Sequence, residues 1–114
     1  MAEKTVFQRI IDREIPAEIV YEDAECIAFK DIRPQAPFHV LVVPKRVIPT
    51  LNDLSDADAQ TIGHLFVAMR TIAAEQGLTG GYRVVVNCGP DAGQEVMHVH
   101  FHMVAGRKFG WPPG

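Results

Sequence analysis

His98-Val99-His100-Phe101-His102-Met103-Val104 alternates histidine with apolar residues near the end of a chain of 114 residues. Successive side chains of a strand point to opposite faces of its sheet. The alternation therefore predicts a strand over residues 97–104 that carries three histidines on one face. The opposite face is apolar, which suits packing against a helix, and its members are Met97, Val99, Phe101 and Met103.

The rest of the chain predicts an α+β fold built on a single sheet. Short β-prone runs cover residues 18–22, 26–30, 38–43 and 82–87, and the nearly continuous apolar run at 38–43 is typical of a central strand. Apolar residues at helical spacing predict a short helix that includes residues 6–11 and stops near Pro16, and a long helix that begins at Ser55 and ends near Gly77. We expect one domain over residues 1–114, with about five antiparallel strands and two helices beside them.

The composition excludes several classes of protein. The apolar fraction of 47% and the charged fraction of 22% are those of an ordinary globular domain. The formal net charge of −3 argues against a protein that coats nucleic acid. No apolar run is long enough to cross a bilayer, and six charged residues among the first fourteen exclude a secretory peptide. With only two cysteines, Cys26 and Cys88, we expect a cytoplasmic protein without membrane or nucleic-acid partners.

The histidine face has three structural explanations besides a catalytic one: a solvated face, a structural metal site or buried hydrogen-bonding histidines. Strict alternation beside a glycine-rich loop, residues 87–95, favours a functional row. His39 joins this row if the strand over residues 38–43 lies nearby. Glycines in the loop let a phosphate approach backbone N–H groups closely.

A row of imidazoles can displace a group from phosphorus without a metal or cofactor. A neutral imidazole nitrogen attacks an anionic phosphorus well and forms a labile P–N bond, which divides one hard displacement into two easier ones. The attacking nitrogen must be unprotonated, so the other nitrogen of that ring should donate to a backbone carbonyl. A neighbouring histidine can then protonate the departing amine.

Residues 98–104 resemble the His-φ-His-φ-His-φ-φ signature of the histidine triad family, where φ is apolar. The resemblance extends over residues 5–114 and includes the block 31–45, Asn87, Gly93-Gln94 and the ending Trp111-Pro112-Pro113-Gly114. These segments are similar to the purine nucleoside phosphoramidase branch, the histidine triad nucleotide-binding proteins. The resemblance implies a homodimer whose sheet extends across both subunits, and hydrolysis of the P–N bond of purine nucleoside 5′-phosphoramidates.

The resemblance also implies roles for individual residues. His100 would be the nucleophile, His98 and His102 would flank it, and His39 would support the row. Asp31 would accept hydrogen bonds from the ribose. The base pocket would be lined by Phe7, Ile10, Phe29 and Ile32, and the phosphate or ribose would be held by Asn87, Gly93 and Gln94. The tail, residues 105–114, would dock near the active site and place Trp111 by the partner's site.

Two positions depart from that branch. Glu95 stands where many members carry a hydroxyl residue, and an ionised carboxylate cannot donate a hydrogen bond to a phosphate. Val47 stands where many members have a histidine. His64 on the long helix and the two cysteines are assigned no role.

Three functions compete on the sequence. The first is a hydrolase that binds an AMP-like purine nucleotide and cleaves phosphoramidates or aminoacyl adenylates through a nucleotidyl-His100. The second is a zinc-binding protein that uses the histidine row as ligands. The third is a nucleotide-binding regulatory scaffold with little turnover. A ribose acceptor at Asp31 and a phosphate loop favour the first over the second.

Overall fold

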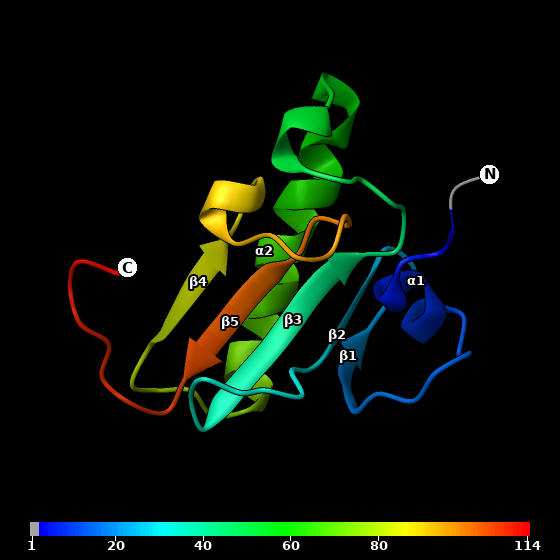
Figure 1. Cartoon of the computed structure of the whole chain (residues 1–114). Helices are drawn as coiled ribbons and strands as arrows, with labels where there is room; N and C mark the ends of the chain where they lie inside the picture. The colour runs from blue at the N-terminus through cyan, green and yellow to red at the C-terminus, as the bar shows by residue number, and fades with distance from the viewer. Residues whose placement is uncertain (1–2) are drawn as a thin grey trace.

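The structure is a computed structural model that describes residues 3–114. It confirms the predicted architecture of two α-helices and one five-stranded antiparallel sheet of order β1-β2-β3-β5-β4 (Figure 1). In chain order the elements are α1 (Val6–Ile11), β1 (Ile19–Glu22), β2 (Cys26–Lys30), β3 (Phe38–Pro44), α2 (Ala59–Glu75), β4 (Tyr82–Val86) and β5 (Phe101–Ala105).

β3 is the central strand, as the apolar run predicted. It pairs with β2 on one side and β5 on the other, and its residues from His39 to Pro44 are buried. The long helix α2 crosses behind the sheet in the view of Figure 1, and α1 lies beside the β1–β2 end. Each face of the sheet therefore has its own cover and its own apolar cluster.

The two apolar clusters follow the alternation along the strands. Leu65, Met69 and Ile72 of α2 pack with Val40 and other residues on one face. On the other face, α1 contributes Phe7 and Ile10, which pack with Ile27, Phe29, Leu41 and Val43. Successive residues of β2 and β3 thus belong to opposite clusters. The long helix covers one face, and the short helix α1 covers only part of the other.

The two helices begin differently, because only α1 has a side chain that caps its free N–H groups. The Thr5 hydroxyl accepts from the Gln8 N–H at 3.1 Å, and the Gln8 side chain accepts from the Thr5 N–H at 2.8 Å. At the predicted start of the long helix, Ser55 caps a 3-10 turn over Asp56–Asp58, and the α-helix itself begins at Ala59. The helix ends before Gly77, whose φ of +66° suits glycine.

The last strand starts later than the alternation predicted. β5 begins at Phe101, so His98 and His100 precede the strand. Its partner β3 ends at Pro44, which has no N–H to extend the ladder, and Val99 donates instead to the Ile48 carbonyl at 2.7 Å. The apolar face also loses one expected member, because Met97 is 52% exposed.

Within the described residues, none of the helices has the length and apolar character needed to span a membrane.

Candidate active site

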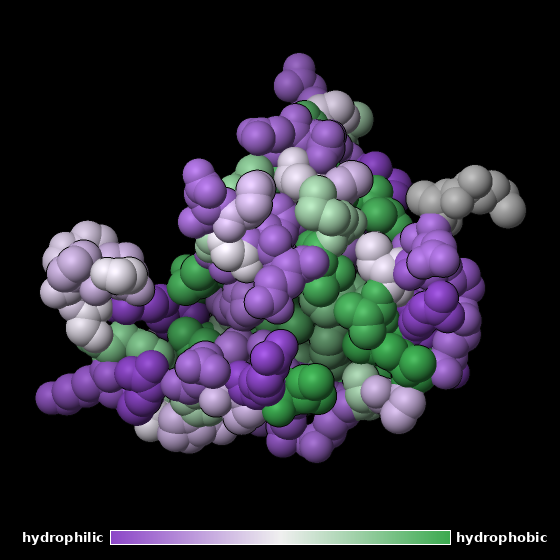
Figure 2. All heavy atoms as spheres, viewed as in Figure 1, coloured by the Kyte–Doolittle hydropathy of each residue, from purple (hydrophilic) through white to green (hydrophobic). Residues whose placement is uncertain are grey.

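An open cleft of about 1130 Å³ lies on the face of the sheet opposite α2. Its lining comes from α1, the strands β2 to β5, the loop before β5 and the C-terminal tail. Figure 2 views this face and shows hydrophobic side chains at its centre among hydrophilic ones. The cleft combines an apolar wall with the side chains of His39, His100 and His102.

His39 and His102 form a hydrogen-bonded pair on adjacent strands. Nε2 of His39 lies 3.0 Å from Nδ1 of His102, and Nδ1 of His39 accepts from the Gln35 N–H at 3.0 Å. Because the Gln35 N–H can only donate, Nε2 of His39 carries the hydrogen and donates it to His102. The remaining hydrogen of His102 is therefore on Nε2, and this ring lines the cleft.

His100 is held in the opposite tautomer. Its Nδ1 lies 2.8 Å from the His98 carbonyl, which can only accept, so Nδ1 is protonated and Nε2 has a free lone pair. The ring packs edge-on against Phe7 at 4.9 Å and lies 5.2 Å from the ring of His102. A nucleophilic imidazole needs such a hydrogen bond from its second nitrogen to a carbonyl, because the bond keeps the attacking nitrogen unprotonated.

His98 lies beneath the other two rings and not in the cleft. It is 0% exposed, its Nε2 donates to the Pro44 carbonyl at 2.7 Å, and its Nδ1 faces the Thr5 hydroxyl at 3.5 Å. The ring therefore ties the segment before β5 to the end of β3 and to the start of α1. Through its own backbone carbonyl, the same residue orients His100.

The surroundings of His39, His98 and His102 favour their neutral forms. Burial lowers the pKa of His39 and the pKa of His98. Burial also lowers the pKa of His102, and the nearby His100 and His39 lower it further. The Asp31 carboxylate, 3.4 Å from Nε2 of His39, acts in the opposite direction on His39 and His102. Neutral forms suit the tautomers that hydrogen bonds give His39 and His98.

The residues expected around the base and ribose lie together at one end of the cleft. Phe7, Ile10 and Phe29 form a buried apolar wall. Ile32 also lines the cleft but is 92% exposed, so it lies at the rim. One oxygen of Asp31 accepts from the Arg33 N–H at 2.9 Å, and the other is the oxygen nearest to His39.

The loop before β5 brings some of its predicted residues to the cleft. Asn87, Gly93 and the exposed Glu95 line it, and Glu95 lies 3.9 Å from Arg33. Gln94 points elsewhere: its amide donates to the Pro49 and Val96 carbonyls at 2.7 and 3.0 Å and accepts from the Gly89 N–H at 2.9 Å. Its side chain braces the loop.

The C-terminal tail borders the cleft through residues other than the tryptophan. Phe109, Gly110, Pro112 and Pro113 line the cleft, whereas Trp111 is 85% exposed. Two arginines hold the tail. Arg83 donates to the Gly110 carbonyl at 2.8 Å, and Arg107 donates to the Gln35 carbonyl at 3.1 Å and lies over the Phe109 ring at 4.2 Å.

Arg83 and Arg107 both line the cleft and were not predicted from the sequence. A signal for Arg83 exists, because Arg83, Val85 and Asn87 alternate with apolar residues and share the cleft face. Arg107 lies just after the last strand, where the sequence pattern does not indicate which way a side chain points. Both arginines add positive charge beside the histidines.

One group in the cleft has the donor atoms to hold a metal ion. Asp31, His39 and His102 each place one ligand atom within 4.8 Å of the others. The three histidines of the motif do not form such a group, and both nitrogens of His98 and Nδ1 of His100 face hydrogen-bonding partners.

Comparison with known proteins agrees with this geometry. The family model described as the HIT domain matches residues 12–109. An uncharacterized HIT-like protein of Synechococcus elongatus is 52% identical over all 114 residues of both chains. A 14 kDa zinc-binding protein of Zea mays is 46% identical over 96% of this chain and 88% of its own.

A solved structure of a HIT family hydrolase from Legionella pneumophila superposes with a TM-score of 0.94. It is 44% identical, and the match covers 97% of this chain and 100% of that one. The fold, the ordered histidines and the family match over residues 12–109 lead to one conclusion. The chain belongs to the HIT domain family.

Proposed function

We propose that the protein is a purine nucleotide-binding hydrolase that cleaves the P–N bond of adenosine or other purine nucleoside 5′-phosphoramidates, and aminoacyl adenylates. This places it in the phosphoramidase branch of the family. The observation that carries the proposal is the bond between Nδ1 of His100 and the His98 carbonyl, because it leaves Nε2 of His100 unprotonated.

In the first step, the lone pair on Nε2 of His100 attacks phosphorus and the P–N bond to the leaving amine breaks. The nucleotidyl-imidazole keeps its Nδ1 hydrogen and is positively charged, and the His98 carbonyl stabilises this charge. The departing amine takes its proton from solvent, because a neutral imidazole N–H is too weak an acid to supply it. Nε2 of His102, whose ring lies 5.2 Å from that of His100, donates a hydrogen bond to the phosphoryl group and keeps its hydrogen.

In the second step, water attacks the same phosphorus and the bond to Nε2 of His100 breaks. The water proton passes to solvent, and His100 returns to its neutral form with the hydrogen on Nδ1. His39 holds His102 with its hydrogen on Nε2 throughout, because the Gln35 N–H occupies Nδ1 of His39. The products are the free amine and a nucleoside monophosphate.

The cleft supports a nucleotide as the substrate. A planar base suits the apolar wall of Phe7, Ile10 and Phe29, with Ile32 at the rim. The Asp31 carboxylate accepts from ribose hydroxyls, and Asn87 and the backbone around Gly93 approach the phosphate. Gln94 supports that loop, Glu95 lies beside the leaving group, and Trp111 reaches the site of a partner subunit.

A homodimer completes this proposal. Phe66 and Val67 of α2 and Tyr82 of β4 are exposed apolar side chains, and β4 is an edge strand of the sheet. A second copy would cover this surface and continue the sheet. Sedimentation equilibrium at micromolar concentration should show twice the chain mass, and a purely monomeric species would contradict the dimer.

Steady-state hydrolysis of adenosine 5′-phosphoramidate tests the function. The wild type should release AMP and ammonia, and His100→Ala should lose at least about four orders of magnitude in turnover, the worth of a removed covalent step. The variant should bind AMP with nearly wild-type affinity, because base, ribose and phosphate contacts lie elsewhere. Wild-type turnover in His100→Ala would refute the proposal.

A zinc site in the cleft is the second candidate, since a maize relative is named as a zinc-binding protein. The group Asp31, His39 and His102 could hold such an ion. Chelator treatment distinguishes the two functions. Hydrolysis should survive EDTA, and loss of activity that zinc restores would favour the zinc function.

A further inference from the structure

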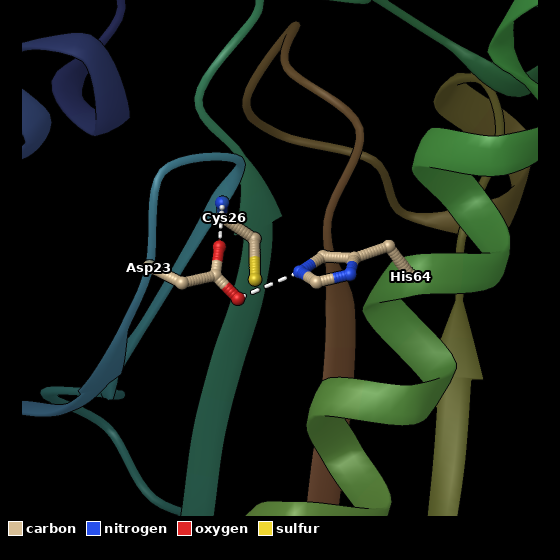
Figure 3. Close-up of side chains that lie close together, drawn as sticks. All are labelled: Asp23, Cys26 and His64. Atoms are coloured by element: carbon tan, nitrogen blue, oxygen red, sulfur yellow. Dashed lines mark hydrogen bonds and ion pairs between the residues drawn. The ribbon is translucent and has the colours of Figure 1, made fainter.

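A second cluster of metal-binding side chain types lies on the face of the sheet that α2 covers (Figure 3). Asp23 is in the turn between β1 and β2, Cys26 is the first residue of β2, and His64 is on α2. Nε2 of His64 lies 2.6 Å from an oxygen of Asp23, and one ligand atom of each residue lies within 4.8 Å of the others. None of the three lines the cleft.

Hydrogen bonds outside the cluster already orient the Asp23 carboxylate. Its Oδ1 accepts from the N–H groups of Glu25 at 2.8 Å and Cys26 at 2.9 Å. These bonds aim Oδ2 at His64, and the Tyr21 hydroxyl donates to the same oxygen at 3.0 Å. Burial raises the pKa of Asp23, but these hydrogen bonds outweigh it and hold that pKa below its usual range.

A carboxylate also orients His64. Oε2 of Glu25 lies 3.3 Å from Nδ1 of His64, the nitrogen that faces away from Asp23. A hydrogen on Nδ1 that is donated to Glu25 leaves Nε2 free as a ligand. Histidines that bind metals commonly donate their second nitrogen to a carboxylate in this way.

The donor set selects a class of cation. A thiolate, an imidazole and a carboxylate suit zinc and similar borderline divalent ions, whereas magnesium and calcium prefer oxygen ligands alone. Cys26 is fully buried, but Asp23 and His64 are partly exposed. An ion can therefore enter from solvent, and a water molecule can be its fourth ligand. Zinc bonds of 2.0–2.3 Å place tetrahedral ligands about 3.3–3.7 Å apart, so the pair at 2.6 Å must open slightly.

We propose that Asp23, Cys26 and His64 bind one zinc-class divalent ion, with water as the fourth ligand. The ion would link the β1–β2 turn to α2 and would be structural, because the cluster lies across the sheet from the histidine row. When the Zn–S bond forms, the Cys26 thiol loses its proton to solvent. The proposal does not depend on the proposed hydrolase activity.

The thiol makes this binding pH-dependent. A cysteine binds zinc as the thiolate, so the ion must displace the thiol proton at neutral pH. Each ion bound should therefore release at least one proton, and binding should weaken as the pH falls from 8 to 6. A site of oxygen and imidazole ligands alone would show no thiol proton.

Cobalt and zinc titrations of the full, chelator-treated protein test the proposal. Co²⁺ should bind in a ratio of one per chain, with the visible bands of a tetrahedral site and the near-ultraviolet charge-transfer band of a thiolate ligand. His64→Gln and Cys26→Ser should each weaken binding at least tenfold, and Cys26→Ser should abolish the charge-transfer band. The matched controls Cys88→Ser, at the other free cysteine, and His102→Gln, in the histidine row, should bind as the wild type does.

Four results would overturn the proposal: no binding by the wild type, wild-type affinity in His64→Gln, absence of the thiolate band, or loss of binding in His102→Gln. The circular dichroism of each variant reports its folding. Zn²⁺ should also raise the melting temperature of the wild type and of Cys88→Ser but not that of His64→Gln. Because His64 is partly exposed on the surface of α2, His64→Gln is the variant expected to fold normally.

Discussion

The four imidazoles of the histidine row differ in the hydrogen-bonding partners of their two ring nitrogens. His100 donates from Nδ1 to a carbonyl and keeps Nε2 free, and His102 accepts at Nδ1 and keeps a hydrogen on Nε2. Adjacent rings thus provide a nucleophile and a hydrogen-bond donor at a centroid separation of 5.2 Å. His39 and His98 support these two rings. His39 accepts from the Gln35 N–H, and His98 donates to the Pro44 carbonyl.

His98→Ala should affect stability more than catalysis. The substitution leaves the buried Pro44 carbonyl without its 2.7 Å bond and opens a cavity beneath His100, at a cost of about 2–4 kcal/mol of unfolding free energy. The backbone carbonyl that orients His100 remains, so turnover should fall much less than in His100→Ala.

Urea unfolding and steady-state hydrolysis of the same samples measure both effects. His102→Ala is the matched control, because its ring is partly exposed and its removal should cost less stability and more turnover. A His98→Ala protein with wild-type stability would contradict the buried role of His98.

Sequence patterns predict residue types in the site better than side-chain directions. Alternation placed His98, His100 and His102 on one face, but it could not show that His98 turns into the interior, because Pro44 ends the strand ladder there. Gln94 illustrates the same limit. Its position in the loop predicted a contact with phosphate or ribose, whereas its amide forms hydrogen bonds with three backbone groups of the protein.

At the scale of elements, the loop before β5 holds its shape through left-handed backbone and the Gln94 brace. Gly93 has a φ of +90°, and a Cβ there would meet nothing within 4 Å. The cost of a side chain at this position is therefore conformational strain alone. The same open space surrounds Gly63 in α2, where helical φ angles suit alanine.

Gly93→Ala should lose about 1–2 kcal/mol of unfolding free energy and raise KM for the phosphoramidate, because the loop backbone moves out of its left-handed conformation. Gly63→Ala, the matched control, should gain about 0.5–1 kcal/mol with unchanged KM. Thermal unfolding and initial rates measure both. Equal KM values for Gly93→Ala and the wild type would show that this loop does not contact the substrate.

The elements themselves were largely predictable, since each follows from local periodicity and caps. All five strands and both helices appear where the patterns place them, apart from the late start of β5 and the 3-10 turn before α2. The contacts that complete the cleft come from distant segments. Arg83 and Arg107 hold the tail through backbone carbonyls, and no local pattern encodes those pairings.

At the scale of the molecule, the buried histidines couple stability to pH. Burial lowers the pKa values of His39, His98 and His102, so the unfolded chain binds protons more strongly than the folded one. Stability is therefore complete above the unfolded pKa of about 6.5 and decreases as the pH falls through it toward the lower folded values.

Urea unfolding at pH 7.5 and 5.5 should show a lower free energy at the acidic pH. His98→Asn should lose less stability between the two pH values than the wild type does, because one such histidine is gone. Equal pH dependence in both proteins would contradict a neutral, buried His98.

The central claim is that Nε2 of His100 forms a covalent bond to phosphorus. Rapid acid-free quenching of the enzyme during turnover of a phosphoramidate labelled at phosphorus tests it directly. The wild type should carry an acid-labile label, located at His100 by mass spectrometry, and His100→Ala should carry none. Label on that variant at the wild-type level, or label on another histidine, would contradict it.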